Sequence, residues 1–324
     1  MVKVLMASKW HVHAVDYAKQ IQAEPDAEIT CVYDEDPTRG QAWADELGVP
    51  FEPDLAKALA RPDVDAVIVD SPTTDHKRVM VAAANAGKHI FTEKALATTV
   101  EDCNAIAEAI TKSGVKFCIS LRELSSALIQ YCKGLIDSGK LGKIHYMRYR
   151  DAHAGTLHGW LPEYWYDLEK AGGGVLLDLG CHPMYSAPYL LGKPKRIASI
   201  QNTTYAPKGV DDNAVCVVEF ENNAIAVLET SFISPYDAGC FELLGTEGAV
   251  VAIGKEVKVR TKDNPDEWVK LDELPPALPT AMRLWLDGII NGSPIPYDLE
   301  RGTLLTSMIQ NAYISNNEGR IVNM

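Results

Sequence analysis

Residues 64–94 read VDAVIVDSPTTDHKRVMVAAANAGKHIFTEK, and this stretch decides the fold of the first part of the chain. The apolar run Val64–Val69 predicts a buried strand, and His89–Thr92 predicts a second one. Between them, Val79–Ala86 carries apolar residues at helical spacing and stops at Gly87. A strand, a helix and a strand in succession form a βαβ unit, whose two strands are parallel.

The same alternation continues on both sides of this unit. Three further apolar runs predict strands, with helical stretches between them: Val2–Ala7, Glu28–Tyr33 and Val115–Ser120. Repeated βαβ units imply an α/β fold with one parallel sheet and helices on both of its faces. We therefore place a first domain at residues 1–120.

Polar residues mark the expected starts of several helices. Asp54 is the predicted N-cap of a helix in the first domain. Thr98 and Glu101 stand in the capping-box relation, so a helix is expected to start there. Beyond the first domain, Ser125 or Ser126 is expected to cap the next helix.

The rest of the chain, residues 121–324, changes character, because alternating apolar and polar residues replace the helical spacing. Four such segments predict strands of a mostly antiparallel sheet: Ile144–Arg150, Ile197–Thr203, Ala214–Phe220 and Ala224–Phe232. We expect a C-terminal α/β domain built on a large open sheet. Since an open sheet usually needs covering by another subunit, a homodimer or homotetramer is expected.

Length and charge exclude several classes of protein. At 324 residues the chain exceeds the size at which one core usually stops growing, so two domains are expected. The net charge of −13 argues against a nucleic-acid or anionic-membrane surface, and no apolar segment is long enough to cross a bilayer. Seven scattered cysteines without a C-x-x-C pair indicate reduced thiols. We expect a cytoplasmic protein that binds a small molecule.

The segment Ala171–Gly174 contains three glycines, and Asp178 and His182 follow it four residues apart. Glycine lets backbone approach a ligand closely. A helix over this segment would place the carboxylate and the imidazole on one face, where they suit an orienting acid and a base. The alternative interpretation is a glycine loop that leads into a core helix with a hydrogen-bonded histidine.

The loop after the first strand is unusual for a dinucleotide-binding fold. Such folds place G-x-G-x-x-G there to bind the pyrophosphate, whereas Ala7–His13 contains no glycine. Taken alone, this loop argues against nucleotide binding. Asp34, however, ends the second strand, where an acidic side chain binds a ribose diol and repels a 2′-phosphate, so NAD is preferred over NADP. Its other interpretation is an ordinary turn acid.

Four motifs follow one another along the chain: Ser71–His76, Ala86–Lys94, Ala171–His182 and Leu243–Gly248. In this order they resemble the motifs of the glucose-fructose oxidoreductase, inositol dehydrogenase and rhizopine-catabolism protein family, abbreviated Gfo/Idh/MocA. The tail, residues 285–292 and 298–319, also follows the family pattern. The resemblance therefore covers essentially the whole chain.

The resemblance implies an N-terminal Rossmann domain and an NAD-dependent oxidoreductase that acts on a sugar, a sugar acid or a cyclic polyol. It implies that Lys94 hydrogen-bonds the reacting hydroxyl, that His182 accepts the hydroxyl proton, and that Asp178 orients the site. The residues expected to bind the cofactor are Ser8, Trp10, His11, Asp34, Ser71, Pro72, Thr73, His76, Glu93 and Lys94. Those expected to contact substrate are Arg122, Trp165, Asp178 and His182.

General chemistry supports these roles. Oxidising a secondary alcohol requires a proton acceptor, and a nearby lysine stabilises the developing alkoxide. The cofactor supplies the hydride chemistry, so no metal is required. Histidines do cluster, at His11 and His13 and at His153 and His158, but without a recognised metal-ligand spacing, so no metal site is expected.

Two further positions depart from the family pattern. Ala95 replaces the proline that usually follows the motif lysine, and Tyr185 stands where many members have aspartate.

Three functions stay open. The first is an NAD-dependent sugar or polyol dehydrogenase, the second a glycosidase or lyase that oxidises its substrate transiently without net NADH, and the third a non-catalytic ligand sensor.

Overall fold

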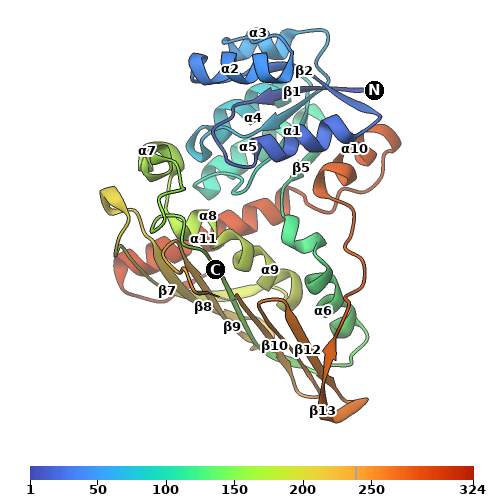
Figure 1. Cartoon of the computed structure of the whole chain (residues 1–324), viewed down its shortest axis with the longest axis vertical. Coiled ribbons are helices and arrows are strands. Elements are labelled where there is room, and N and C mark those ends of the chain that lie inside the picture. Colours follow the sequence, from blue (N-terminus) through green and yellow to red (C-terminus); the bar gives the residue numbers. More distant parts are fainter. Residues whose placement is uncertain (238) are drawn as a thin grey trace. The chain divides into compact units, whose positions relative to one another are not determined.

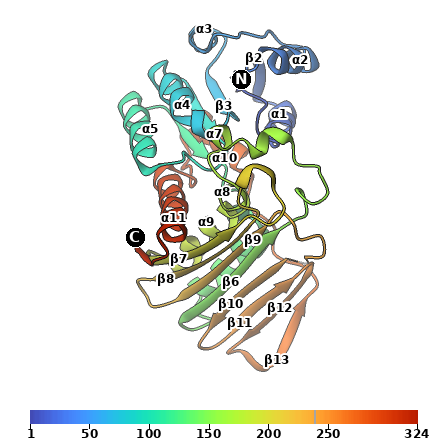
Figure 2. The same cartoon turned by 90° about the vertical axis from the view of Figure 1, so that its left-hand side faces the viewer.

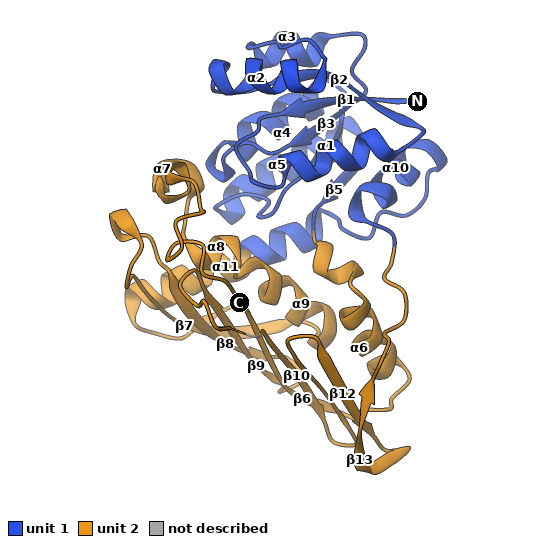
Figure 3. Cartoon of the chain, in the orientation of Figure 1, with its two compact units in different colours: residues 1–120, 279–306 blue, residues 121–278, 307–324 orange. Residues whose placement is uncertain are grey.

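The computed structural model describes residues 1–237 and 239–324, and the chain divides into two compact units (Figure 1). The first unit holds Met1–Ser120 and Pro279–Thr306, and the second holds Leu121–Leu278 and Ser307–Met324 (Figure 3). A segment from late in the sequence therefore completes the first unit. It contributes α10 (Ala281–Asn291) and the beginning of α11 (Leu299–Glu318).

The first unit is built on one sheet of five strands, all paired in parallel, in the order β2-β1-β3-β4-β5. The strands are β1 (Val2–Ala7), β2 (Ala27–Tyr33), β3 (Ala66–Val69), β4 (His89–Thr92) and β5 (Phe117–Ile119). The connecting helices are α1 (Ala14–Ala23), α2 (Pro37–Leu47), α3 (Leu55–Ala60), α4 (His76–Asn85) and α5 (Val100–Ser113). The predicted parallel, Rossmann-type sheet is confirmed.

Three helix N-caps were predicted from the sequence. Those at Asp54 and Ser126 are confirmed, and the one at Thr98 is not. The Asp54 carboxylate accepts the backbone N–H groups of Ala56 and Lys57, so it caps α3 as expected. The prediction that Thr98 caps α5 is wrong, since the hydroxyl of Thr99 accepts the Asp102 N–H at 3.1 Å. An N-cap takes a non-helical backbone, and Thr99 does so at φ −133° and ψ 152°.

The second unit is built on nine strands in the order β13-β12-β11-β10-β6-β9-β8-β7-β14 (Figure 2). Their bounds are β6 (Ile144–Ala152), β7 (Pro194–Asn202), β8 (Asn213–Phe220), β9 (Ile225–Ser231), β10 (Cys240–Gly245), β11 (Ala249–Ile253), β12 (Glu256–Thr261), β13 (Asn264–Leu271) and β14 (Val322–Asn323). Among the described pairs only β6 and β9 run parallel. The predicted mostly antiparallel sheet is therefore confirmed.

Helices cover one face of this nine-stranded sheet. They are α8 (Val175–Asp178) and α9 (Cys181–Leu191), and α6 (Ala127–Asp137), capped by Ser126, packs on α9; the short α7 (Leu168–Ala171) precedes α8. Helix α9 packs on β6 and β9, and α8 packs on β8. Along β8, alternate residues such as Cys216 and Val218 are buried under this layer, while Val215 and Val217 lie exposed on the opposite face. The alternation seen in the sequence thus separates a covered face from an open one.

All seven cysteines carry free thiols, as expected, and six of them are buried. None of the described helices combines the length and the apolar character needed to cross a membrane.

Candidate functional site

Each strand of the first unit's sheet ends at a buried polar residue. Ser8, Asp34, Asp70, Glu93 and Ser120 directly follow β1 to β5, and each is at most 3% exposed. Buried polar groups are costly unless they are hydrogen-bonded, so five of them along one edge indicate a built site. In open parallel sheets ligands bind at this carboxyl edge.

The glycine-free loop after β1 begins with a residue in the left-handed conformation. Ser8 has φ +77°, a region that glycine occupies readily and serine rarely. Its N–H donates to the Tyr33 carbonyl at 2.7 Å, and its hydroxyl accepts the Trp10 N–H at 3.1 Å. Trp10 itself is buried. The side-chain hydrogen bond therefore helps this loop to take the conformation that glycine usually supplies.

Asp34 holds the loops after β1 and β2 together. One carboxylate oxygen accepts the Lys9 N–H at 2.9 Å, the other accepts the Asp36 N–H at 2.8 Å, and the Arg39 guanidinium binds both. The neighbouring Glu35 is also paired with Arg39 but keeps about a quarter of its side chain exposed. Burial, followed by the charge of Asp34, raises the pKa of Glu35. Arg39 and Glu35 thus belong to the hydrogen-bonded network around Asp34, although no sequence motif indicated either residue.

Asp70 and Ser71 lie at the end of β3 with side-chain oxygens that have no hydrogen-bond partner among the described residues. Both residues are buried. Burial, reinforced by the charge of Glu93, raises the pKa of Asp70 well above its usual value. The buried Asp70 carboxyl therefore favours its protonated form more than an exposed carboxyl does. Pro72 and Thr73, predicted to line the same pocket, follow directly as the buried start of a short 3₁₀ turn.

His76 connects the turn after β3 to the strand end that carries Lys94. Its Nε2 lies 3.1 Å from the Ser71 carbonyl, and its Nδ1 lies 2.9 Å from the Ala95 carbonyl. Burial lowers the pKa of His76, although these carbonyls oppose the shift. The Lys94–Ala95 peptide bond is cis. His76 therefore fixes the backbone beside Lys94, whose side chain is buried and lies 4.0 Å from Glu93.

Glu93 is surrounded by groups from three separate parts of the first unit. His13 Nδ1 lies 3.4 Å and His11 Nε2 4.0 Å from its Oε1. The Tyr17 hydroxyl donates to its Oε2 and is hydrogen-bonded to the Ser120 hydroxyl at 2.7 Å. Burial alone would raise the pKa of Glu93, but the facing histidines and Lys94 outweigh it and hold the pKa well below its usual value.

In the second unit, the helix that would place Asp178 and His182 on one face is interrupted between them. Helix α8 ends at Asp178 and α9 begins at Cys181, with a wide turn in which the Gly180 N–H donates to the Val175 carbonyl at 2.9 Å. A Cβ on Gly180 would lie 2.4 Å from the Leu176 carbonyl oxygen, so this turn requires glycine. The four-residue spacing of Asp178 and His182 therefore does not place both residues on one face of a single continuous helix.

His182 is buried, and its orienting partner is a phenol. Its Nδ1 lies 2.6 Å from the Tyr185 hydroxyl, which also accepts the backbone N–H of Glu123 at 3.2 Å. Burial, reinforced by the charge of Glu123, raises the pKa of Tyr185 well above its usual value, so this phenol is neutral. The sequence showed tyrosine in place of aspartate at this position, but not that the residue touches His182.

Asp178 lies near a second histidine of the second unit. Burial lowers the pKa of His153, and the charge of Asp178 partly offsets this shift. The His153 ring stacks on Phe232 with ring centroids 5.1 Å apart. In the sequence, His153 forms a cluster with His158, but no role was predicted for it.

Two of the four predicted substrate contacts, Arg122 and Trp165, lie in short 3₁₀ turns of the second unit. Arg122 has an exposed side chain, 3.3 Å from the Glu123 carboxylate. Trp165 is buried next to Tyr164, and the centroids of their rings are 6.2 Å apart. Arg122 is therefore open to ligands, whereas Trp165 presents little surface.

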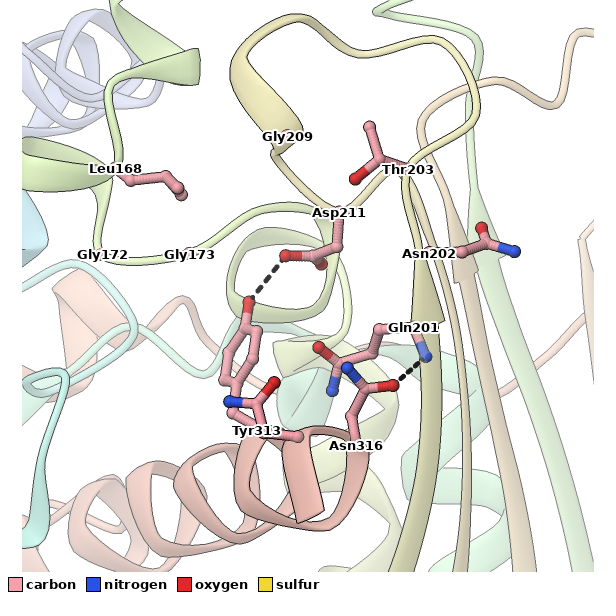
Figure 4. Close-up of a pocket in the computed structure, with 11 residues that line it drawn as sticks. Leu168, Gly172, Gly173, Gln201, Asn202, Thr203, Gly209, Asp211, Tyr313 and Asn316 are labelled. Carbon is pink, nitrogen blue, oxygen red and sulfur yellow. Dashed lines mark hydrogen bonds between the residues drawn. The ribbon is translucent and has the colours of Figure 1, made fainter. Parts of the chain in front are cut away.

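The glycine segment before α8 is anchored beside a cavity of about 330 Å³ (Figure 4). Asp211 accepts the Gly174 N–H and the Leu176 N–H, each at 3.0 Å, and the Tyr313 hydroxyl at 3.1 Å. A Cβ on Gly174 would lie 2.3 Å from the Asp211 carbonyl oxygen. Burial raises the pKa of Asp211. The three glycines thus allow a tight backbone turn that Asp211 and Tyr313 hold in place.

Comparison with known proteins identifies the family. Residues 12–121 match the model described as the oxidoreductase family with an NAD-binding Rossmann fold, and residues 129–251 match the Gfo/Idh/MocA C-terminal domain. The scyllo-inositol 2-dehydrogenase (NAD(+)) of Bacillus subtilis is 30% identical over 239 residues, which cover 71% of this chain and 67% of that enzyme. The chain belongs to the Gfo/Idh/MocA oxidoreductase family.

Other Gfo/Idh/MocA relatives agree with this assignment. The myo-inositol 2-dehydrogenase of Thermotoga maritima is 26% identical over 246 residues, which cover 73% of this chain and 71% of that enzyme. The crystal structure of an oxidoreductase from Agrobacterium radiobacter in complex with NAD+, L-tartaric acid and magnesium superposes with a TM-score of 0.85 at 19% identity, over 99% of this chain and 98% of that one. This structure supports the fold.

Proposed function

We propose that the protein is an NAD-dependent dehydrogenase that transfers hydride between nicotinamide and a secondary alcohol of a sugar, sugar acid or cyclic polyol. The observation that carries the proposal is the buried polar edge of the parallel sheet, where Asp70 and Ser71 keep side-chain oxygens without a partner among the described residues. Groups of this kind fit a ligand rich in hydroxyl and amide groups, as a dinucleotide is. The inositol dehydrogenases among its relatives support the substrate class.

The same edge would hold the cofactor, which when bound supplies the hydride acceptor. The residues that we assign to it are Ser8, Trp10, His11, Asp34, Ser71, Pro72, Thr73, His76, Glu93 and Lys94. His76 contributes by fixing the backbone on either side of the pocket. Asp34 and Glu35, at the end of β2, supply two carboxylates against the single guanidinium of Arg39, and this net negative charge favours NAD over NADP, whose 2′-phosphate it would repel.

Three residues carry the proton chemistry in this proposal. Lys94 donates a hydrogen bond to the reacting hydroxyl and stabilises the negative charge that develops on it, an effect that burial strengthens. His182 accepts the hydroxyl proton, a role for which the imidazole is the side chain that enzymes use most often. Asp178 orients the site, and Tyr185 holds the His182 ring. Arg122, whose side chain is exposed, contacts the substrate, and the buried Trp165 offers it only a small part of its surface.

The test is NADH formation, measured by absorbance, when the purified chain is mixed with NAD+ and a panel of sugars, sugar acids and inositols. We expect turnover with at least one of them. Lys94→Met and His182→Asn should each reduce kcat about 100-fold or more, whereas His145→Asn, an exposed change on β6, should not.

Two other outcomes would replace this function by one of the alternatives. Conversion of a glycoside without NADH, by protein purified with bound cofactor, would indicate a redox-neutral glycosidase or lyase. Absence of any turnover, combined with binding of a sugar, would indicate a ligand sensor.

A further inference from the structure

Three side chains of types that ligate metal ions come together in the first unit, although the sequence spacing predicted no metal site. His11 and His13 lie in the glycine-free loop after β1, and Glu93 follows β4. One potential ligand atom from each lies within 4.8 Å of the other two. The third ligand is 80 positions from His13, so no local motif could reveal the set.

The distances are close to those that a zinc ion requires. Ligands at 2.0–2.2 Å in tetrahedral geometry lie about 3.3 Å from one another. His13 Nδ1 is already 3.4 Å from Glu93 Oε1, and His11 Nε2 is 4.0 Å from the same oxygen. The three ligand atoms, which lie within 4.8 Å of one another, must therefore draw closer when a metal ion binds. Two histidines and one glutamate form the ligand set of a three-ligand zinc site that keeps an open position.

The surroundings of Glu93 have the character of an outer ligand shell. Its second oxygen accepts the Tyr17 hydroxyl, which is in turn bound to Ser120, so the carboxylate is held with Oε1 toward the histidines. Outer-shell hydrogen bonds of this kind orient ligands in metal sites. The His13 side chain is 21% exposed, so a cation has a path to the cluster.

Two features of the cluster oppose the binding of a metal ion and lower its affinity. Lys94 Nζ lies 4.0 Å from the same Glu93 oxygen and repels a cation. His11 Nδ1 accepts the His13 N–H at 3.2 Å, and this contact is lost when the ring proton moves to Nδ1 to free Nε2. A hydrogen bond of 3.2 Å is weak beside a metal–ligand bond, and the negative charge of Glu93 offsets part of the repulsion from Lys94.

We propose that His11, His13 and Glu93 bind one divalent transition-metal ion of the zinc class, at the position where dinucleotide folds usually carry glycines. His11 and Glu93 are also assigned to the cofactor, but metal binding itself requires neither nucleotide nor substrate and is tested without them.

The test is a calorimetric titration of the full chain with zinc chloride, after removal of metal by a chelator and with no nucleotide present. The wild-type chain should bind one equivalent. His13→Ala should weaken binding by about 10-fold or more, Tyr17→Phe should weaken it about 10-fold through the outer shell, and His145→Ala should leave it unchanged. Cobalt in place of zinc should give the visible absorption of a tetrahedral site.

His13 is the most informative position, because it is partly exposed and its side chain makes no helix-capping bond, so the variant should fold. Circular dichroism checks this. No zinc binding by the wild-type chain, or equal affinity in the wild type and in folded His11→Ala and His13→Ala variants, would overturn the proposal. Because no nucleotide is added, either result stands apart from the dehydrogenase test.

Discussion

In the proposed mechanism His182 is the base, and its orienting partner is a neutral phenol. The Tyr185 hydroxyl lies 2.6 Å from its Nδ1, and burial keeps that phenol protonated. A phenol stabilises a protonated imidazole less than a carboxylate does. Tyr185→Asp should therefore raise the pKa of His182 and move the acidic limb of kcat/KM about one pH unit upward.

The measurement is the pH profile of kcat/KM for the wild type, Tyr185→Asp and Tyr185→Phe. Tyr185→Phe is the matched control, because it removes the hydroxyl without adding charge. An acidic limb at the same pH in folded Tyr185→Asp and in the wild type would show that His182 is not the base.

The buried Asp70 leads to a second prediction, which concerns how the folding stability of the chain depends on pH. Burial and the charge of Glu93 raise the pKa of Asp70 in the folded chain. An acid whose folded pKa lies above its unfolded value, about 3.9, costs stability as pH rises from that value through the folded pKa. Asp70→Asn removes this cost, so the variant should be about 1–3 kcal/mol more stable than the wild type at pH 8, and the difference should shrink toward pH 4.

Urea denaturation of both proteins between pH 4 and 8 measures this difference. Asp65→Asn, a change near the start of β3, is the control. The same pH dependence in Asp70→Asn and in the wild type would mean that Asp70 is ionised when folded.

Two adjacent threonines precede α5, and the sequence did not show which of them is the N-cap. The Thr99 hydroxyl accepts the Asp102 N–H at 3.1 Å, whereas Thr98 precedes the cap. Thr99→Ala should destabilise the chain by about 1 kcal/mol, and Thr98→Ala by clearly less. Thermal unfolding of the two variants compares them directly, and a larger loss in Thr98→Ala would place the cap where the sequence pattern put it.

Periodic patterns predicted most elements, because burial imposes the periods of strands and helices on the sequence. Contacts between distant segments were not predictable. Glu93 meets His11 and His13 only after β1 and β4 are placed in one sheet. Strand β13 was also missed, because its residues Asn264–Leu271 are mostly exposed and carry no apolar alternation.

The spacing of Asp178 and His182 misled for a local reason. A wide turn at Gly180 separates α8 from α9, and only backbone coordinates reveal it. The sequence did select both residues, and it marked Tyr185 as unusual, but it gave no sign that the phenol replaces a carboxylate as the partner of the imidazole.

The nine-stranded sheet of the second unit leaves an apolar face open, and we expect a second copy of the chain to cover it. Ile200 on β7 pairs with Val215 on β8, both are exposed, and Val217 lies on the same face. Contiguous exposed apolar residues of this kind mark protein interfaces. Val217→Lys should shift the oligomer toward monomer, measured by light scattering after size exclusion.

The control is Ile290→Lys, which changes an equally exposed apolar residue on α10 of the first unit. A wild-type chain that is monomeric at micromolar concentration, or an oligomer unchanged by Val217→Lys, would rule out this face as the interface.

The carboxyl edge of the five-stranded sheet is central to the proposed function, because every cofactor contact assigned to the chain lies along it. Titration of the full chain with NAD+ and NADP+ by calorimetry, without substrate or added metal, tests it most directly. We predict one NAD+ per chain, bound about tenfold or more tightly than NADP+, a difference of about 1.4 kcal/mol. Binding of neither nucleotide by the folded chain would contradict the proposal.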